Sequence, residues 1–105
     1  MENKIKVMLT TFSKKEYALK IGEKLVELNL SPCIQLITQI ESIYKWEGKV
    51  KKEEEILLLI KYDIQKESEL ITYLKEHHSY ENPEIISTKF DIKNSDYIQW
   101  FFSEK

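Results

Sequence analysis

At residues 56–60 the chain reads Ile56-Leu57-Leu58-Leu59-Ile60, an unbroken run of five aliphatic side chains. Successive side chains of a strand point to opposite faces of the sheet, so this run predicts a strand that is apolar on both faces. An antiparallel strand with one face in water alternates apolar with polar residues instead. The second face of this strand must therefore be covered, and self-association is the covering that we favour. The alternative is that a C-terminal helix alone folds over it.

The segments around this run predict alternating strands and helices, because their apolar residues recur with periods of two and of about 3.6. The expected elements are strands at 5–12, 33–44, 56–60 and 84–92, and helices at 13–29, 65–77 and from Asn94 onward. This βαββαβ order with an added C-terminal helix predicts a single α+β domain over residues 1–105. The expected architecture is a ferredoxin-like sandwich, in which both helices cover one face of an antiparallel sheet.

The strand at 33–44 leads to a turn at Glu47-Gly48, and the arrangement predicts an extended hairpin with the strand that follows. Its even positions form one expected apolar face, namely Ile34, Leu36, Ile40, Tyr44 and Trp46. The charged stretch 51–55 has the composition of a solvated segment. Tyr44 and Trp46 near the tip either stack across the hairpin or pack on another subunit.

The composition of the chain argues against several classes of binding partner. The chain of 105 residues has 16 lysines, no arginine, 18 acidic residues and a net charge of -2. Bidentate recognition of phosphate or of a guanine edge normally uses arginine, and a net acidic chain has no general attraction to nucleic acid or anionic lipid. We therefore expect no nucleic-acid partner, no membrane partner and no phosphate-cradling enzyme. A single cysteine cannot form an intramolecular disulfide, which favours a cytoplasmic location.

The candidate metal ligands are few. Cys33 is the only thiol, and the only histidines are the pair His77-His78. Imidazole and thiolate bind Zn²⁺ or copper, and Glu81 or Glu84 could add a carboxylate if the fold brings the groups together. Neighbouring residues of a helix point about 100° apart, so both imidazoles cannot easily join one site. The alternatives are a Cys33 that packs as a small apolar residue and histidines that interact with a helix C-terminus.

Several spaced segments together resemble the signatures of the CutA divalent-cation tolerance family. They are residues 42–49 (Ser-Ile-Tyr-Lys-Trp-Glu-Gly-Lys) with 53–55 and 58–61, residues 77–85 (His-His-Ser-Tyr-Glu-Asn-Pro-Glu-Ile), and residues 96–100 (Asp-Tyr-Ile-Gln-Trp). The resemblance covers nearly the whole chain with its spacing intact. It implies a non-enzymatic, ferredoxin-like homotrimer whose long hairpins extend the sheets of neighbours. Bacterial members are associated with tolerance to copper and other divalent cations, and a mammalian member with the anchoring of acetylcholinesterase.

By position, the resemblance implies weak binding of Cu²⁺ or Zn²⁺ that folding does not require. We expect His78 to be the principal ligand, with His77, Cys33 and Glu84 as further candidates. Thr10 stands where some members have an additional cysteine, so a two-thiolate copper site is not available within one chain. Ser79 stands where the family usually has proline, and the turn after the histidines is expected to be looser.

The resemblance also implies a cleft between subunits. The residues that match its typical positions are Tyr44, Trp46, Lys49, Lys61, Tyr80, Tyr97 and Trp100. The alternative function is therefore a ligand-sensing or protein-anchoring module. In that interpretation the cleft binds a small anion or a peptide near Lys49, Lys61 and Tyr80.

Overall fold

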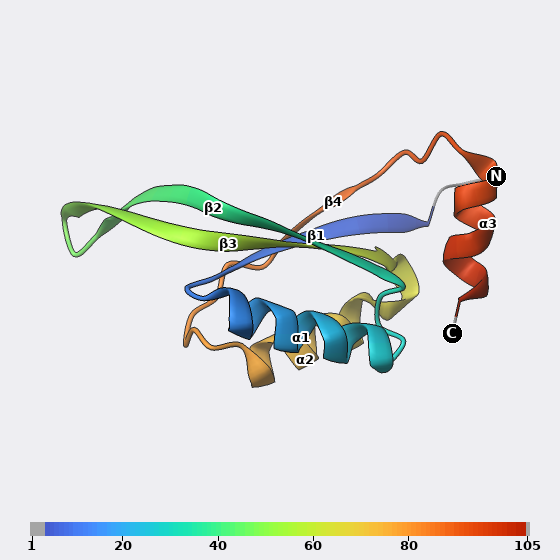
Figure 1. Ribbon diagram of the computed structural model, residues 1–105, viewed down its shortest axis with the longest axis horizontal. Coiled ribbons are helices and arrows are strands. Elements are labelled where there is room, and N and C mark those ends of the chain that lie inside the picture. Colours follow the sequence, from blue (N-terminus) through green and yellow to red (C-terminus); the bar gives the residue numbers. More distant parts are fainter. Residues whose placement is uncertain (1–3, 105) are drawn as a thin grey trace.

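The structure is a computed structural model that describes residues 4–104. Its elements are β1 (Ile5–Phe12), α1 (Lys15–Glu27), β2 (Cys33–Trp46), β3 (Lys49–Asp63), the 3₁₀ turn η1 (Ile64–Lys66), α2 (Glu67–His77), β4 (Ile86–Lys89) and α3 (Ser95–Ser103). The strands form one four-stranded antiparallel sheet in the order β2-β3-β1-β4. The helices α1 and α2 lie together on one side of this sheet, and α3 stands beyond its end (Figure 1). The expected α+β class is thus confirmed.

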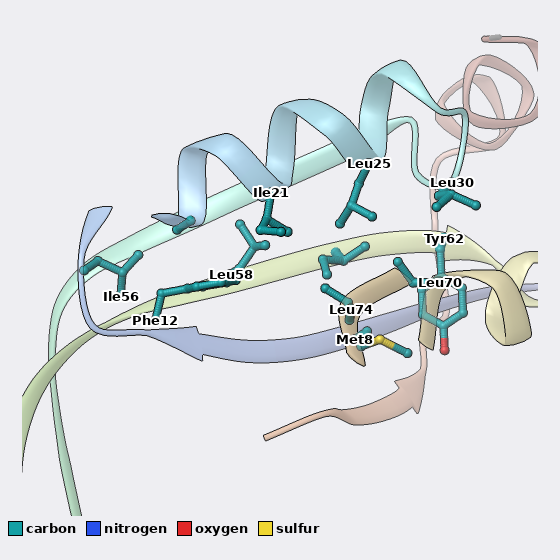
Figure 2. Packing of buried hydrophobic residues seen from close by; sticks show 12 residues of the cluster. Met8, Phe12, Ile21, Leu25, Leu30, Ile56, Leu58, Tyr62, Leu70 and Leu74 are labelled. Carbon is teal, nitrogen blue, oxygen red and sulfur yellow. The ribbon is translucent and has the colours of Figure 1, made fainter. Parts of the chain in front are cut away.

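The hydrophobic core lies between the sheet and the pair α1 and α2 (Figure 2). From β3 it receives alternate side chains, of which Leu58, Ile60 and Tyr62 are fully buried. The other buried residues of this cluster come from both helices, from β1, from an earlier position of β3 and from the loop after α1, namely Met8, Phe12, Ala18, Ile21, Leu25, Leu30, Ile56, Leu70 and Leu74. Burial of each large aliphatic side chain contributes about 1.5–3 kcal/mol, so this layer supplies the main stabilisation of the single chain.

The opposite side of the sheet, called here the second face, is only partly covered. Leu57 and Leu59 of β3 point to it and are half-buried, and Ile37 beside them on β2 is 47% exposed. The helix α3 reaches this face where the Tyr97 hydroxyl lies 3.3 Å from the Lys61 ammonium. In the single chain, α3 leaves Ile37 exposed and Leu57 and Leu59 only half-buried.

The expectation of one apolar face at the even positions of β2 is wrong. The register of β2 against β3 shifts between residues 37 and 40, and Gln39 there has a positive φ of 58°. Such a β-bulge adds one residue to one strand, so side chains beyond it exchange faces. Before the bulge, Leu36 pairs with Leu58 and packs against the core. Beyond it, Tyr44 lies on the second face, together with Ile40 and Trp46.

The ends of several elements also differ from those predicted. β3 begins at Lys49, so the charged stretch is part of the hairpin, and β4 spans only Ile86–Lys89 rather than 84–92. Asn94 caps α3 as expected, because its side chain accepts a hydrogen bond from the Asp96 amide. The first helix begins later than predicted, with Lys14 at its N-cap and no side-chain capping bond. Among residues 4–104, no helix is both long and apolar enough to cross a membrane.

A charged network ties α2 to the two central strands. Glu67 Oε2 accepts hydrogen bonds from the Lys6 ammonium and from the Tyr62 hydroxyl, each at 2.6 Å. Glu67 lies in the first turn of α2, where a negative charge also interacts favourably with the helix dipole. The hydrogen bond from Lys6, followed by that from Tyr62, lowers the pKa of Glu67 below its ordinary value of 4.5.

We predict that Glu67→Gln lowers the free energy of unfolding by about 1–2 kcal/mol at pH 7, because the charged acceptor of both hydrogen bonds is lost. The folded pKa of Glu67 is depressed, so its contribution is present above the unfolded pKa and is lost as pH falls through the folded one. Urea unfolding at pH 7 and at pH 3 should therefore show a smaller difference from the parent at pH 3. Glu69→Gln, exposed in the same first turn, is the control for the interaction with the helix dipole and should lower stability much less than Glu67→Gln.

Candidate functional site

The helix α2 ends between the two histidines, and this separates them. His77 is the last helical residue, whereas His78 has an extended backbone with φ of -65° and ψ of 144°. The exposed His77 ring stacks on Tyr73, with ring centroids 4.1 Å apart, and its Nδ1 donates to the Tyr73 carbonyl at 3.0 Å. In the neutral imidazole the proton therefore resides on Nδ1, and Nε2 keeps its lone pair.

His78 is held between two aromatic rings on the helix-covered side of the sheet. Its ring is stacked on Phe12 at 4.1 Å between centroids and lies 5.4 Å from the Tyr80 ring. The Tyr80 amide donates to His78 Nδ1 at 3.0 Å, so in the neutral ring Nε2 bears the proton and donates to Thr10 Oγ1 at 2.9 Å. Both nitrogens of His78 are thus engaged in hydrogen bonds. Burial lowers the pKa of His78 below its ordinary value of 6.5, although Thr11 and Glu55 act in the opposite direction.

Tyr80 joins this histidine to a carboxylate at the base of the hairpin. The Tyr80 hydroxyl donates to Glu55 Oε2 at 2.6 Å, and Glu55 is only 7% exposed. Burial, followed by this bond to Glu55, raises the pKa of Tyr80 well above its ordinary value of 10. Tyr80 therefore keeps its phenolic proton at neutral pH and can donate this hydrogen bond. It ties the segment after α2 to β3.

A groove of about 930 Å³ opens beside this pair. Its lining residues are Thr11, Tyr44, Trp46, Lys51, Glu53, Glu55, Tyr80, Glu81, Asn82 and Glu84. A hydrogen bond to Glu53 raises the pKa of the Tyr44 hydroxyl. Acidic side chains outnumber the single lysine of the lining, so the electrostatics of the groove favour a cation over a small anion.

The candidates for the cleft do not all gather here. Tyr44, Trp46 and Tyr80 line the groove. Lys61 lies at the other end of the sheet, where its ammonium sits 5.4 Å above the Tyr97 ring. Trp100 lies next to Tyr97, and their ring centroids are 5.5 Å apart. Lys49 lies at the hairpin tip, where it pairs with Trp46. Within one chain, the lysines expected to hold an anion are therefore at opposite ends of β3.

The candidate metal ligands are also dispersed. Cys33 pairs with Lys61 on the second face, whereas His78 contacts Thr10 and Phe12 on the helix-covered face. Glu84 lines the acidic groove. Across the part of the chain that the structure describes, no three His, Cys, Asp or Glu side chains are grouped closely enough to hold a metal ion.

Sequence reasoning missed the buried position of Glu55 and the contribution of Glu53 to the groove. Both belong to the charged stretch that was expected to be solvated. The signal was the period of two in β3, because Glu53 and Glu55 continue the alternation of Leu57 and Leu59 along the second face.

We predict that stability decreases as the pH falls below about 6.5, because the unfolded chain protonates His78 near that pH and the folded protein resists it. The loss begins near the unfolded pKa and stops growing below the folded one. Urea midpoints between pH 8 and pH 5 measure it. His78→Gln should remove most of this dependence while lowering stability at pH 8 by about 1–2 kcal/mol. His77→Gln, at an exposed ring, should retain the dependence, and an equal effect of both variants would contradict the assignment.

Comparison with known proteins identifies the family. The family model described as CutA1 divalent ion tolerance protein matches residues 6–104. A divalent-cation tolerance protein CutA of Pectobacterium atrosepticum is 34% identical over 94 residues, which are 90% of this chain and 86% of that protein. A CutA homolog of Xenopus laevis is 41% identical over 80 residues, which are 76% of this chain and 53% of that protein.

Solved structures agree. CutA1 from Oryza sativa superposes with a TM-score of 0.91 at 30% identity, covering 95% of this chain and 92% of that one. The divalent cation tolerance protein from Thermus thermophilus gives a TM-score of 0.87 at 33% identity and covers 92% of this chain and 94% of that one. The chain therefore belongs to the CutA family of divalent-cation tolerance proteins.

Proposed function

We propose that this protein acts in tolerance to divalent cations, copper among them, as a cytoplasmic, non-enzymatic homotrimer that binds Cu²⁺ or Zn²⁺ weakly. The observation that carries the proposal is the match of residues 6–104 to a family named for divalent ion tolerance. The protomer is ferredoxin-like, and the sheet order β2-β3-β1-β4 with α1 and α2 on one side supports this. The tolerance named for the relatives is extended to this chain by that kinship.

The partly covered second face supports self-association. Its strip of aliphatic side chains comprises Leu9, Ile37, Leu57, Leu59 and Ile86 from all four strands. The arm of the hairpin adds exposed Tyr44 and Trp46 on the same face. An apolar surface of this kind on a single chain is typical of a protein interface. Trimer formation would bury this surface. Leu57 and Leu59 would then be buried, which is the environment expected for a strand that is apolar on both faces.

The end of α2 supports weak metal binding. His77 has a free lone pair on Nε2 of an exposed ring. A neutral imidazole nitrogen of this kind is a suitable ligand for Cu²⁺ and Zn²⁺. Binding through His78 would replace one of its two hydrogen bonds. Cys33 and Glu84 could complete the coordination only from a neighbouring subunit or after rearrangement. The expected affinity is accordingly modest, with His77 as the first point of contact.

The anion-sensing alternative receives less support. Lys49 and Lys61 are separated along β3, and the groove beside Tyr80 has an excess of carboxylates. A cation therefore suits this groove better than an anion does.

The assembly is tested with Ile37→Asp, which places a charge in the aliphatic strip of the second face. Native mass spectrometry of the parent should show three chains, and the variant should dissociate because the charge would be buried unpaired. Leu19→Asp is the matched control, since Leu19 is similarly exposed, at 41%, but lies on α1 on the other side of the sheet. A parent that remains a single chain at micromolar concentration would overturn the assembly.

Metal binding is tested by titrating Cu²⁺ and Zn²⁺ into the assembled protein and counting bound ions by native mass spectrometry. His77→Ala should lower the Cu²⁺ affinity several-fold, because it removes the available imidazole nitrogen. Lys75→Ala, also exposed in the last turn of α2, should leave the affinity unchanged. If the parent takes up no metal, or if His77→Ala binds as the parent does, the proposed metal contact is wrong while the assembly can still stand.

A further inference from the structure

Two adjoining hollows surround the C-terminal end of α1, and together they are called here the terminal groove. The larger, of about 860 Å³, lies between this end of α1, the junction of β3 with η1, and α3. The smaller, of about 410 Å³, lies between the same end of α1 and α2. Leu30 lines both. The groove thus lies on the helical side of the molecule, away from the second face.

The way in which α1 ends exposes apolar side chains in this groove. The Asn29 amide bonds to the Val26 carbonyl at 3.1 Å and the Leu30 amide to the Leu25 carbonyl at 2.9 Å. With a φ of 60° at Asn29, these two bonds form a Schellman motif. The motif turns Leu30 into the core and leaves Leu28 50% exposed. Leu28 lines the smaller hollow, whereas the larger one is lined by exposed Val26 on α1, exposed Phe102 on α3 and buried Phe101.

Carboxylates surround this apolar surface. The acidic residues of the lining are Glu27, Asp63, Glu69, Glu76 and Glu104, and the lining has Lys66 as its cation. Lys24 lies outside the lining, with its ammonium 3.3 Å from the Glu27 carboxylate. The local excess of negative charge is larger than the net charge of -2 on the whole chain. The groove therefore combines an apolar floor with an acidic rim.

We propose that the terminal groove docks a segment of a partner protein that presents apolar side chains flanked by lysine or arginine, as an amphipathic basic helix does. Apolar anchors enter such grooves at helical spacing, and complementary charges at the rim fix the orientation. An anionic membrane surface and a nucleic acid are repelled by the same rim. In the proposed assembly, a second copy of this chain would instead meet the aliphatic strip on the other side of the sheet. No residue named above for the assembly or for metal coordination lines this groove, although Tyr73, which stacks on His77, does.

The probe for this site is a fluorescently labelled helical peptide of leucine and lysine, about 14 residues or four turns long, with leucines at helical spacing. The comparison peptide keeps the leucines and replaces every lysine by glutamate. Fluorescence anisotropy with the full chain should show at least about tenfold tighter binding of the lysine peptide, which corresponds to about 1.4 kcal/mol of discrimination. Equal binding of the two peptides, or no binding of either, would overturn the proposal.

Leu28→Asp separates docking from general charge attraction. It removes an apolar anchor and adds a negative charge, so docking predicts about tenfold weaker binding of the lysine peptide, whereas simple attraction predicts tighter binding. Leu19→Asp makes the same change on α1 outside the groove and should not weaken binding. Glu76→Lys should also weaken binding, and Glu23→Lys, on α1 outside the lining, should do so less.

Two further outcomes would contradict the proposal. If Leu28→Asp changes the number of chains seen by native mass spectrometry and Leu19→Asp does not, a second copy occupies the groove and the proposal is wrong. If Leu28→Asp binds the lysine peptide as tightly as the parent does, the apolar floor has no part in recognition and the proposal is again wrong. Far-ultraviolet circular dichroism of each variant verifies that the fold is retained.

Discussion

The pairing of β3 with both β1 and β2 is the constraint on which the rest of the structure depends. β3 runs through the middle of the sheet, and its register decides which side chains enter the core. A slip of one residue would turn Leu58 and Ile60 to the second face and bring Leu57 and Leu59 inward. The same register places Glu55 where the Tyr80 hydroxyl reaches it. The register of β3 against its neighbours therefore determines the core, the second face and the acidic groove together.

Most of the fold follows from periodicity. The aliphatic run at 56–60, the period of 3.6 in α1 and α2, and the Asn94 cap predict elements that the structure contains. The bulge in β2 does not follow from the sequence, because Gln39 adopts a positive φ without being a glycine or an asparagine. Since one extra residue reverses the parity of a strand, a single local conformation was enough to place Tyr44 and Trp46 on an unexpected face.

The candidate site was harder to predict because its residues meet across long separations in the chain. Helical geometry indicated that His77 and His78 diverge, and the predicted end of the helix at His77 is confirmed. The environment of His78 depends on Phe12 and Thr10 of β1, and Thr10 is 68 residues away in the sequence. Which imidazole nitrogen is available depends on hydrogen bonds to the Tyr73 carbonyl, the Tyr80 amide and the Thr10 hydroxyl, which the sequence alone does not show.

The bulge at Gln39 also divides the hairpin into two parts with different freedom to change. Below it, β2 and β3 are held by the core and by β1, so an insertion there would disturb every neighbouring element. Beyond it, the two strands pair only with each other within the chain. Adding one residue to each strand of this ribbon would extend it by about 3.4 Å, and adding two to each would preserve which face every side chain occupies. Evolution can thus adjust the reach of the arm in whole steps while the body of the protein stays the same.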